Sequence, residues 1–156
     1  WLRRVAQLGD GLGEAVAIEA LLNFYASERR AVKEEDAEER GRRALTLYGE
    51  LGDRRAQCDV LQALARVRLG SSDDVQAVAR AQEAVAIAKD AGDADLLVTA
   101  LLRKSAMYME VEDLGRAANS AKKALAAARD GRSKRAEAIA MLGGAEVSAA
   151  SRQVSV

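Results

Sequence analysis

The chain repeats itself at an interval of 40 residues, and this regularity constrains its fold more than any other feature. The segment 44–53, which reads ALTLYGELGD, recurs as AVAIAKDAGD at 84–93 and more loosely as ALAAARDG at 124–131. A fixed period of this size is typical of repeat architectures, in which each unit packs against its neighbours. Such arrays present extended surfaces to partners, and so the period favours a binding protein over an enzyme.

The composition favours helices throughout. Of 156 residues, 34 are alanine, the best helix former, and none is proline, which breaks helices. Apolar residues make up 49% of the chain and charged residues 31%, which argues against both a disordered and a membrane-spanning chain. We therefore expect an all-α protein, an α-solenoid of antiparallel helix pairs, with no membrane association.

Charge and cysteine content limit the partners and the compartment. Lys+Arg and Asp+Glu are both 24, and a net charge of zero argues against nucleic acid as the partner. The single cysteine, Cys58, cannot form an internal disulfide, which fits the cytoplasm, with a processed organellar subunit as the alternative. The chain begins with Trp1 and has no signal-peptide pattern, so we expect an excerpt of a larger protein or a processed subunit.

Each 40-residue unit divides into two helical patterns. In the third unit, Leu97, Leu101 and Tyr108 lie on one apolar face, Asp113 is placed to cap the next helix, and Gly131 to end it. The same reading predicts helices near 13–30, 33–51, 53–70, 73–91, 93–111, 113–130 and 133–150. It divides the chain into the end of a preceding helix and a glycine-rich turn (1–11), three repeats (12–51, 52–91, 92–131) and a half repeat or capping helix (132–156).

Small residues recur at three positions of every unit. These columns hold Ala37, Ala77 and Ala117; Gly41, Ala81 and Ala121; and Ala44, Ala84 and Ala124. Within a unit they follow one another at four and then three residues, which places them on one stripe of the second helix. A large side chain there would hold the two helices of a pair apart. We therefore expect Ala117→Leu to cost about 1–3 kcal/mol by overpacking.

These residues resemble the tetratricopeptide repeat. Leu101, Tyr108, Asp113, Ala117 and Ala124 match the large, aromatic and small positions of that family in order, and the resemblance covers nearly the whole chain. The period of 40 is similar to the long-helix subclass found in kinesin light chain and in bacterial regulatory proteins. Three departures are the missing proline at the end of each repeat, Tyr25 at a position that is usually small, and Lys104 at a usually apolar one.

The resemblance implies a concave face, lined by the first helix of each pair, that binds a peptide or helical segment of a partner protein. The residues mapped to this lining are Glu19, Leu22, Asn23, Arg29, Arg30, Asp59, Gln62, Arg66, Thr99, Leu102, Arg103, Met109 and Glu110, with Ala26, Ala63, Leu69 and Ala106 between them. Its arginines suit a partner with acidic groups. Only Arg103 matches the family's carboxylate clamp for chaperone tails, so that ligand is not expected.

Two charged clusters have simpler explanations than binding. In the run 34–43 the pairs Asp36–Arg40, Glu38–Arg42 and Glu39–Arg43 have the favourable acid-first spacing, which predicts a self-neutralised, solvated helix face. A basic cluster with Asp130 as its only counter-charge could receive an acidic segment, but favourable charges near helix ends explain it as well. This cluster consists of Lys122, Lys123, Arg129, Arg132, Lys134 and Arg135.

No catalytic, cofactor-binding or metal-binding residues are predicted. The chain has no histidine, the commonest general base and metal ligand. Cys58 lies on an apolar face and is expected in the core. The glycines at 9, 11 and 13 resemble a phosphate loop only superficially, because no strand precedes them, and they predict a turn between helices.

The leading hypothesis is a protein–protein interaction scaffold. The alternatives are a regulatory segment of a larger multidomain protein, such as a transcription regulator, and an architectural subunit held in a complex through its ends. A DNA-binding or ATPase segment in the full gene would favour the first alternative, and stoichiometric co-purification would favour the second.

Overall fold

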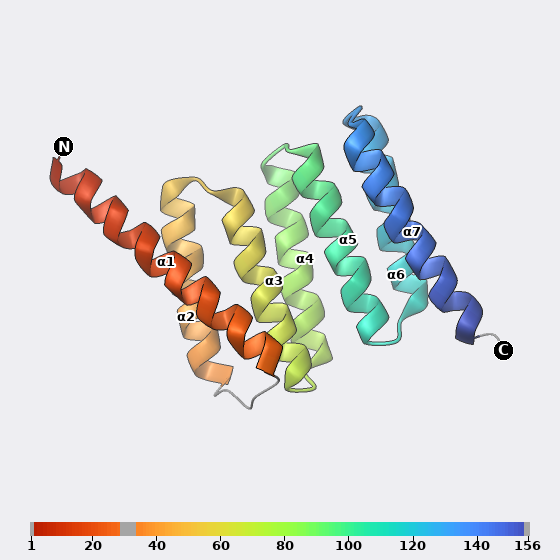
Figure 1. The fold of residues 1–156 in the computed structure, drawn as a ribbon, viewed down its shortest axis with the longest axis horizontal. Helices are drawn as coiled ribbons and strands as arrows, with labels where there is room; N and C mark the ends of the chain where they lie inside the picture. The colour runs from red at the N-terminus through yellow and green to blue at the C-terminus, as the bar shows by residue number, and fades with distance from the viewer. Residues whose placement is uncertain (1, 29–33, 155–156) are drawn as a thin grey trace. The chain divides into compact units, whose positions relative to one another are not determined.

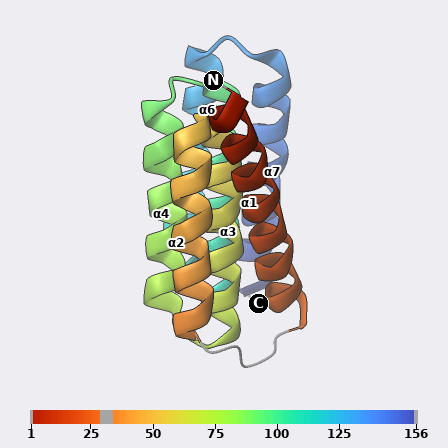
Figure 2. The ribbon, with the colours of Figure 1, turned by 90° about the vertical axis from the view of Figure 1, so that its left-hand side faces the viewer.

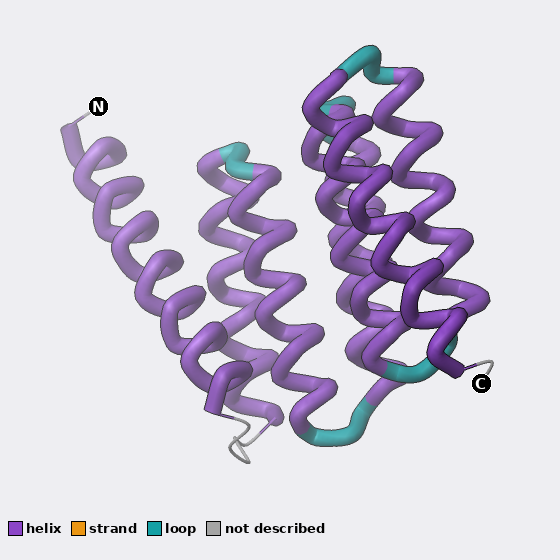
Figure 3. The backbone as a smooth tube through the Cα atoms, turned by 45° about the vertical axis from the view of Figure 1, so that its right-hand side comes forward, coloured by secondary structure: helices purple, strands orange, loops and turns teal. Residues whose placement is uncertain are grey.

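A computed structural model of the chain describes residues 2–28 and 34–154, and within these ranges all regular structure is helical (Figures 1 and 3). Seven helices follow one another in this part of the chain: α1 (Leu2–Glu28), α2 (Glu34–Leu51), α3 (Arg54–Gly70), α4 (Asp74–Asp90), α5 (Ala94–Glu110), α6 (Leu114–Asp130) and α7 (Lys134–Val154). The predicted all-α class is confirmed.

The chain divides into two compact units, Trp1–Arg80 (unit 1) and Ala81–Val156 (unit 2), with the boundary inside α4. In unit 1, α1 packs against both α2 and α3, and α2 packs against α3 (Figure 2). In unit 2, α6 packs against both α5 and α7, which also contact each other. Helices therefore pack mainly with their neighbours in sequence, as in a helical repeat.

One turn geometry recurs every 20 residues, at half the period seen in the sequence. Its central residue has a left-handed backbone with φ between 53° and 72°, and is in turn Gly52, Ser72, Gly92, Glu112 and Arg132. The next residue caps the following helix, accepting a hydrogen bond from the N–H three residues later at 2.9–3.2 Å. These caps are Asp53, Asp73, Asp93, Asp113 and Ser133.

Two predicted helix boundaries are confirmed, at 52–53 and 92–93. In each, the glycine follows the end of one helix and the aspartate caps the start of the next. Asp113 is also the predicted cap. Gly131 ends α6 as predicted, but its φ is −74°, and the left-handed residue is Arg132 instead. The turn is therefore set by its hydrogen bonds and cap, and not by glycine alone.

The predicted turn at residues 9–13 is wrong, because α1 runs without a break from Leu2 to Glu28. Residues 2–8 are the first turns of this helix and not the tail of a separate one. Glycine disfavours a helix by only about 1 kcal/mol relative to alanine, and no proline is present to stop it. Gly11 has a packing reason to be small, since a Cβ there would lie 3.2 Å from Cδ2 of Leu47 in α2.

Gly13→Ala is expected to stabilise the protein by about 0.5–1 kcal/mol, because no atom lies within 4 Å of the new Cβ and alanine restricts the unfolded chain. The urea midpoint of unfolding, followed by circular dichroism, would rise. The matched control is Gly41→Ala, also in a helix, where the new Cβ would lie 2.6 Å from Cδ1 of Leu64. A loss of stability in Gly13→Ala would show that α1 is not helical at this point.

The columns of small residues are confirmed as buried positions. All nine side chains or glycine positions are shielded from solvent: Ala37, Gly41, Ala44, Ala77, Ala81, Ala84, Ala117, Ala121 and Ala124. Gly41 faces Leu64, which is only 1% exposed, and a Cβ at position 41 would lie 2.6 Å from its Cδ1. Cys58 is buried as well, as predicted for a small core residue.

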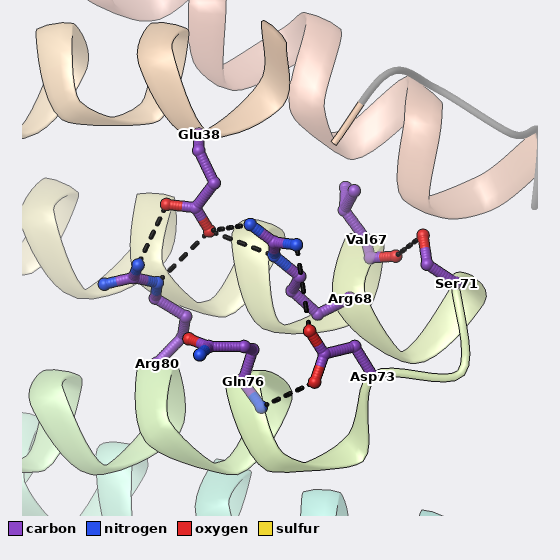
Figure 4. A network of polar contacts seen from close by, with 7 residues as sticks. All are labelled: Glu38, Val67, Arg68, Ser71, Asp73, Gln76 and Arg80. Atoms are coloured by element: carbon purple, nitrogen blue, oxygen red, sulfur yellow. Dashed lines mark hydrogen bonds and ion pairs between the residues drawn. The ribbon is translucent and has the colours of Figure 1, made fainter. Parts of the chain in front are cut away.

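A buried carboxylate ties three helices of unit 1 together (Figure 4). Oε1 of Glu38 in α2 accepts a hydrogen bond from Nε of Arg68 in α3 at 3.1 Å, and Oε2 accepts one from Nη2 of Arg80 in α4 at 2.9 Å. Arg68 also lies 3.8 Å from Asp73, the cap of α4. The side chain of Glu38 is 7% exposed, so these two guanidinium groups replace its lost hydration.

This network corrects the predicted charge pairs of α2. Glu38 bonds to Arg68 and Arg80 and not to Arg42. Arg43 does not pair with Glu39: its Nε and Nη2 donate to the two carboxylate oxygens of Glu14 in α1, at 2.9 and 3.0 Å. Spacing along one helix identifies neighbours on that helix only, whereas here the partners come from other helices.

Candidate binding surfaces

The predicted groove residues of unit 1 do not all line a surface. The prediction for Leu22 is wrong: its side chain does not line a groove but is fully buried in the core formed by α1, α2 and α3. Asn23 and Arg66 are exposed. Glu19, Asp59 and Gln62 are half-buried, while Arg29 and Arg30 lie outside the described residues.

In unit 2 the predicted residues of α5 fall into two groups. Leu102 and Met109 are half-buried and line a cleft between α5 and α7. Thr99 donates a hydrogen bond from its Oγ1 to the carbonyl of Asp95 one turn earlier, at 2.8 Å. Arg103 is half-buried and Glu110 is exposed. The cleft therefore gathers the apolar members of the predicted lining.

The α5–α7 cleft has a volume of about 200 Å³. Its α5 wall consists of Leu102, Ser105, Ala106 and Met109, and its α7 wall of Ile139, Leu142, Gly143 and Glu146. Gly143 allows the helices to approach, since a Cβ there would lie 2.6 Å from Cδ2 of Leu102. The sequence analysis placed Leu102, Ala106 and Met109 in the groove but no residue of α7, although Leu102 and Leu142 are one 40-residue period apart.

The size and lining of the cleft limit what it can bind. Pockets for small molecules usually measure about 300–1,000 Å³, so this cleft suits a single apolar side chain better than a metabolite. Ile139 and Leu142 are 41% and 68% exposed and offer apolar contact at its rim. Glu146 is the only charged side chain of the lining. A cation beside the anchoring side chain would therefore be favoured.

A second, wider hollow of about 560 Å³ lies between α1 and α2 in unit 1. Ala17, Ile18 and Leu21 contribute apolar surface to it. Its charged lining includes the Glu14–Arg43 pair, and the hydrogen bonds from Arg43 hold the pKa of Glu14 below its ordinary value. Asp36, Glu39 and Arg40 complete the lining. Because charges of both signs surround it, the lining of this hollow favours neither an acidic nor a basic partner.

Glu19, one of the predicted groove residues, is hydrogen-bonded to a buried side chain of α2. Its Oε2 accepts a hydrogen bond from the hydroxyl of Tyr48 in α2 at 3.0 Å. Burial, followed by this hydrogen bond to a carboxylate, raises the pKa of Tyr48 to about 12. The pairing fixes α1 on α2 and leaves Glu19 less available to a partner.

The raised pKa of Tyr48 predicts a loss of stability between about pH 10 and 12. In this window the unfolded chain ionises its tyrosine while the folded chain retains the proton, so stability is full below pH 10 and falls as the pH rises. The difference in urea midpoint between wild type and Tyr48→Phe isolates this residue from the lysines. That difference should shrink across the window, and a constant difference would contradict the prediction.

The basic cluster of unit 2 has one more counter-charge than the sequence suggested. Glu137 in α7 lies 3.3 Å from Arg129 and 3.5 Å from Lys134. Asp130 is therefore not the only acidic residue beside the basic cluster, contrary to the prediction. Lys122 and Lys123 are exposed on α6. Lys104, the departure from the family pattern, donates a hydrogen bond to Gln82 and lies 5.5 Å from the ring centroid of Tyr108.

No protein-family model matches the chain, and no curated protein sequence matches it. The resemblance to the tetratricopeptide repeat accordingly depends on the residues of this chain and on the packing of its helices. Among residues 2–28 and 34–154, no helix combines the length and apolar character needed to cross a bilayer.

Proposed function

We propose that this chain is a tetratricopeptide-like solenoid that acts as a protein–protein interaction scaffold. Three observations support the proposal: the turn that recurs every 20 residues, the buried columns of small residues, and the packing of helices mainly against their sequence neighbours within each unit. Folds of this kind hold partners on extended surfaces, so the site must be identified from its own residues.

The α5–α7 cleft is the observation that carries the binding proposal. It is formed within unit 2 by the first helices of two consecutive 40-residue repeats, the elements that the tetratricopeptide resemblance assigns to the partner-binding face. Leu102, Ala106 and Met109 supply one wall, and the exposed Ile139 and Leu142 supply the rim. A partner segment would insert one aliphatic or aromatic side chain, in the manner of an interface anchor.

The charge of the lining modifies the expected partner. The arginines of the predicted groove favour acidic groups, whereas the only charge of the cleft lining is the carboxylate of Glu146. A lysine or arginine beside the anchoring side chain would form an ion pair with it at the partly desolvated rim. We therefore propose a partner segment that combines an apolar anchor with a neighbouring cation.

A random peptide library displayed on phage and selected on the full chain tests this proposal. The enriched peptides should share an aliphatic or aromatic residue next to lysine or arginine. Fluorescence anisotropy of one such peptide should show binding weakened at least about tenfold, or 1.4 kcal/mol, by Leu142→Glu. Glu146→Lys should reverse the preference, so that a peptide with aspartate or glutamate beside the anchor binds better.

Val75→Glu is the matched control, since Val75 is an apolar residue of α4 outside the cleft lining and is 78% exposed, against 68% for Leu142. It should leave peptide affinity unchanged. Equal affinity for wild type, Leu142→Glu and Glu146→Lys, with unchanged melting temperatures, would place the binding surface elsewhere.

A further inference from the structure

Ser105 lies at the floor of the α5–α7 cleft. It is the only buried residue of the cleft lining, with 2% of its surface exposed. Leu102 and Met109 of the same wall are half-buried, and Ile139 and Leu142 of the opposite wall are exposed at the rim. A side chain that enters the cleft to its full depth would therefore meet the hydroxyl of Ser105.

The hydroxyl of Ser105 can accept a further hydrogen bond but cannot donate one. Its hydrogen is donated to the carbonyl of Ala117 in α6, with a distance of 2.8 Å between the two oxygens. A hydroxyl oxygen also has two lone pairs, and among the residues that the structure describes no group donates to Oγ of Ser105. The floor of the cleft therefore presents a hydrogen-bond acceptor.

The packing of the repeat does not require a hydroxyl at this position. One period earlier, the equivalent residue of α3 is Ala65, and its side chain is fully buried. Serine and alanine differ by a single oxygen atom, so both fit the same small space between helices. Burial of a hydroxyl costs free energy unless it is hydrogen-bonded. The Ser105 hydroxyl is thus an addition to the repeat and not part of its packing requirement.

The apolar walls of the cleft favour an aromatic anchor over an aliphatic one. Met109 contributes an unbranched, half-buried side chain to the α5 wall. Methionine adapts its shape to a neighbouring ring, and its thioether sulfur makes favourable contacts with the edges of aromatic rings. An aromatic side chain also buries about 150–250 Å² of surface and loses the freedom of only two rotatable bonds on binding. It therefore gains more from this cleft than an aliphatic side chain does.

We propose that the anchor is a tryptophan whose indole N–H donates a hydrogen bond to Oγ of Ser105. This inference rests on the proposed function, because it specifies the side chain that enters the cleft. Phenylalanine has no donor and would cover the Ser105 oxygen without bonding to it. Tyrosine can donate, but its own oxygen would then need a donor, and both polar side chains of the lining, Ser105 and Glu146, are acceptors. The indole is a donor only, and Glu146, which is exposed, remains available to the neighbouring cation of the partner.

Three peptides that differ only at the anchor test this inference on the full chain. They share the sequence enriched by phage selection and carry tryptophan, phenylalanine or benzothienylalanine, which has the shape of tryptophan with sulfur in place of the N–H group. Fluorescence anisotropy with wild type should show roughly five- to tenfold higher affinity for the tryptophan peptide than for its benzothienyl analogue. Ser105→Ala should reduce this ratio to about one, and Ala65 shows that alanine fits the equivalent position.

Glu146→Gln is the control, because it removes the charge at the rim and keeps Ser105. It should weaken both peptides alike and preserve their affinity ratio. Equal affinities in wild type, a measurement that needs no variant, would overturn the inference. So would a ratio that Ser105→Ala leaves unchanged or that Glu146→Gln abolishes. In these cases, weaker binding to Leu142→Glu would retain the cleft as the binding site, so that only the tryptophan assignment fails. If no peptide is enriched, or if Leu142→Glu binds all three peptides like wild type, the proposed function fails as well.

Discussion

Leucine in place of Ala117 is expected to lower the free energy of unfolding by about 1–3 kcal/mol. The Ala117 side chain is fully buried in unit 2, where it packs with Ala121 and Val147. Its carbonyl accepts the hydrogen bond of Ser105, which fixes α6 at a short distance from α5. Added methylene groups would push the helices apart and leave the Ser105 hydroxyl buried with a weakened partner.

Urea unfolding followed by circular dichroism measures this effect. Ala126→Leu is the control, because Ala126 lies on the same helix but is exposed, and leucine has nearly the same helix propensity as alanine. The control should change stability by no more than about 0.5 kcal/mol. If both variants unfold at the same urea concentration, the small column is not required for close packing of α5 and α6.

Removal of the carboxylate in Glu38→Ala is expected to destabilise unit 1 by about 2–4 kcal/mol, because two guanidinium groups would lose the partner that compensates their desolvation. The side chain of Arg68 is 14% exposed and that of Arg80 is 27% exposed. Arg80 can therefore recover some hydration, which reduces the loss below that of a fully buried pair. The same unfolding experiment on the variant gives the value.

Glu39→Ala provides the matched control one residue away, since Glu39 is exposed and should contribute less than about 0.5 kcal/mol. The double variant Glu38→Leu with Arg68→Leu removes the carboxylate together with the more buried of its two guanidinium partners, so that only Arg80, which is 27% exposed, loses its bond to Glu38. It should be more stable than Glu38→Ala. Equal stability of Glu38→Ala and Glu39→Ala would show that the network contributes nothing net.

Local signals were sufficient to predict most helices and the packing stripe. Asp53, Asp93 and Asp113 follow glycine or a break in apolar periodicity, and each forms the predicted cap. The small columns are buried at contacts between neighbouring helices, and at Gly41 the contact is with Leu64 of α3, the helix after α2, and not with the paired helix α1. Both features depend on residues close in sequence, where spacing alone determines which side chains meet.

The errors concern contacts between distant residues. The glycines of α1 were assigned to a turn, but α1 retains its helix where it packs on α2 and α3, and tertiary contacts override a propensity of this size. Leu22 was assigned to the groove although it points into the core. Glu38 has its partners 30 and 42 positions later in the chain, and no spacing rule within one helix connects them.

The α7 wall of the cleft could have been found by carrying the groove positions of α5 forward by one period. Leu102 corresponds to Leu142 and Ala106 to Glu146. The sequence places these residues on the same face of successive first helices, but the distance that makes them a cleft depends on Gly143 and on the packing of α7 against α5.

The turn that recurs every 20 residues determines how this protein could change length during evolution. The five joints that the structure describes between α2 and α7 share one backbone geometry, so a gene duplication or deletion could begin at any of these without disturbing local structure. Odd- and even-numbered helices nevertheless have different packing faces, as Leu64 and Gly41 illustrate. Loss of a single helix would bring two large stripes together, whereas loss or gain of a helix pair keeps a small-residue stripe facing a large one, and the inheritable module is therefore the pair.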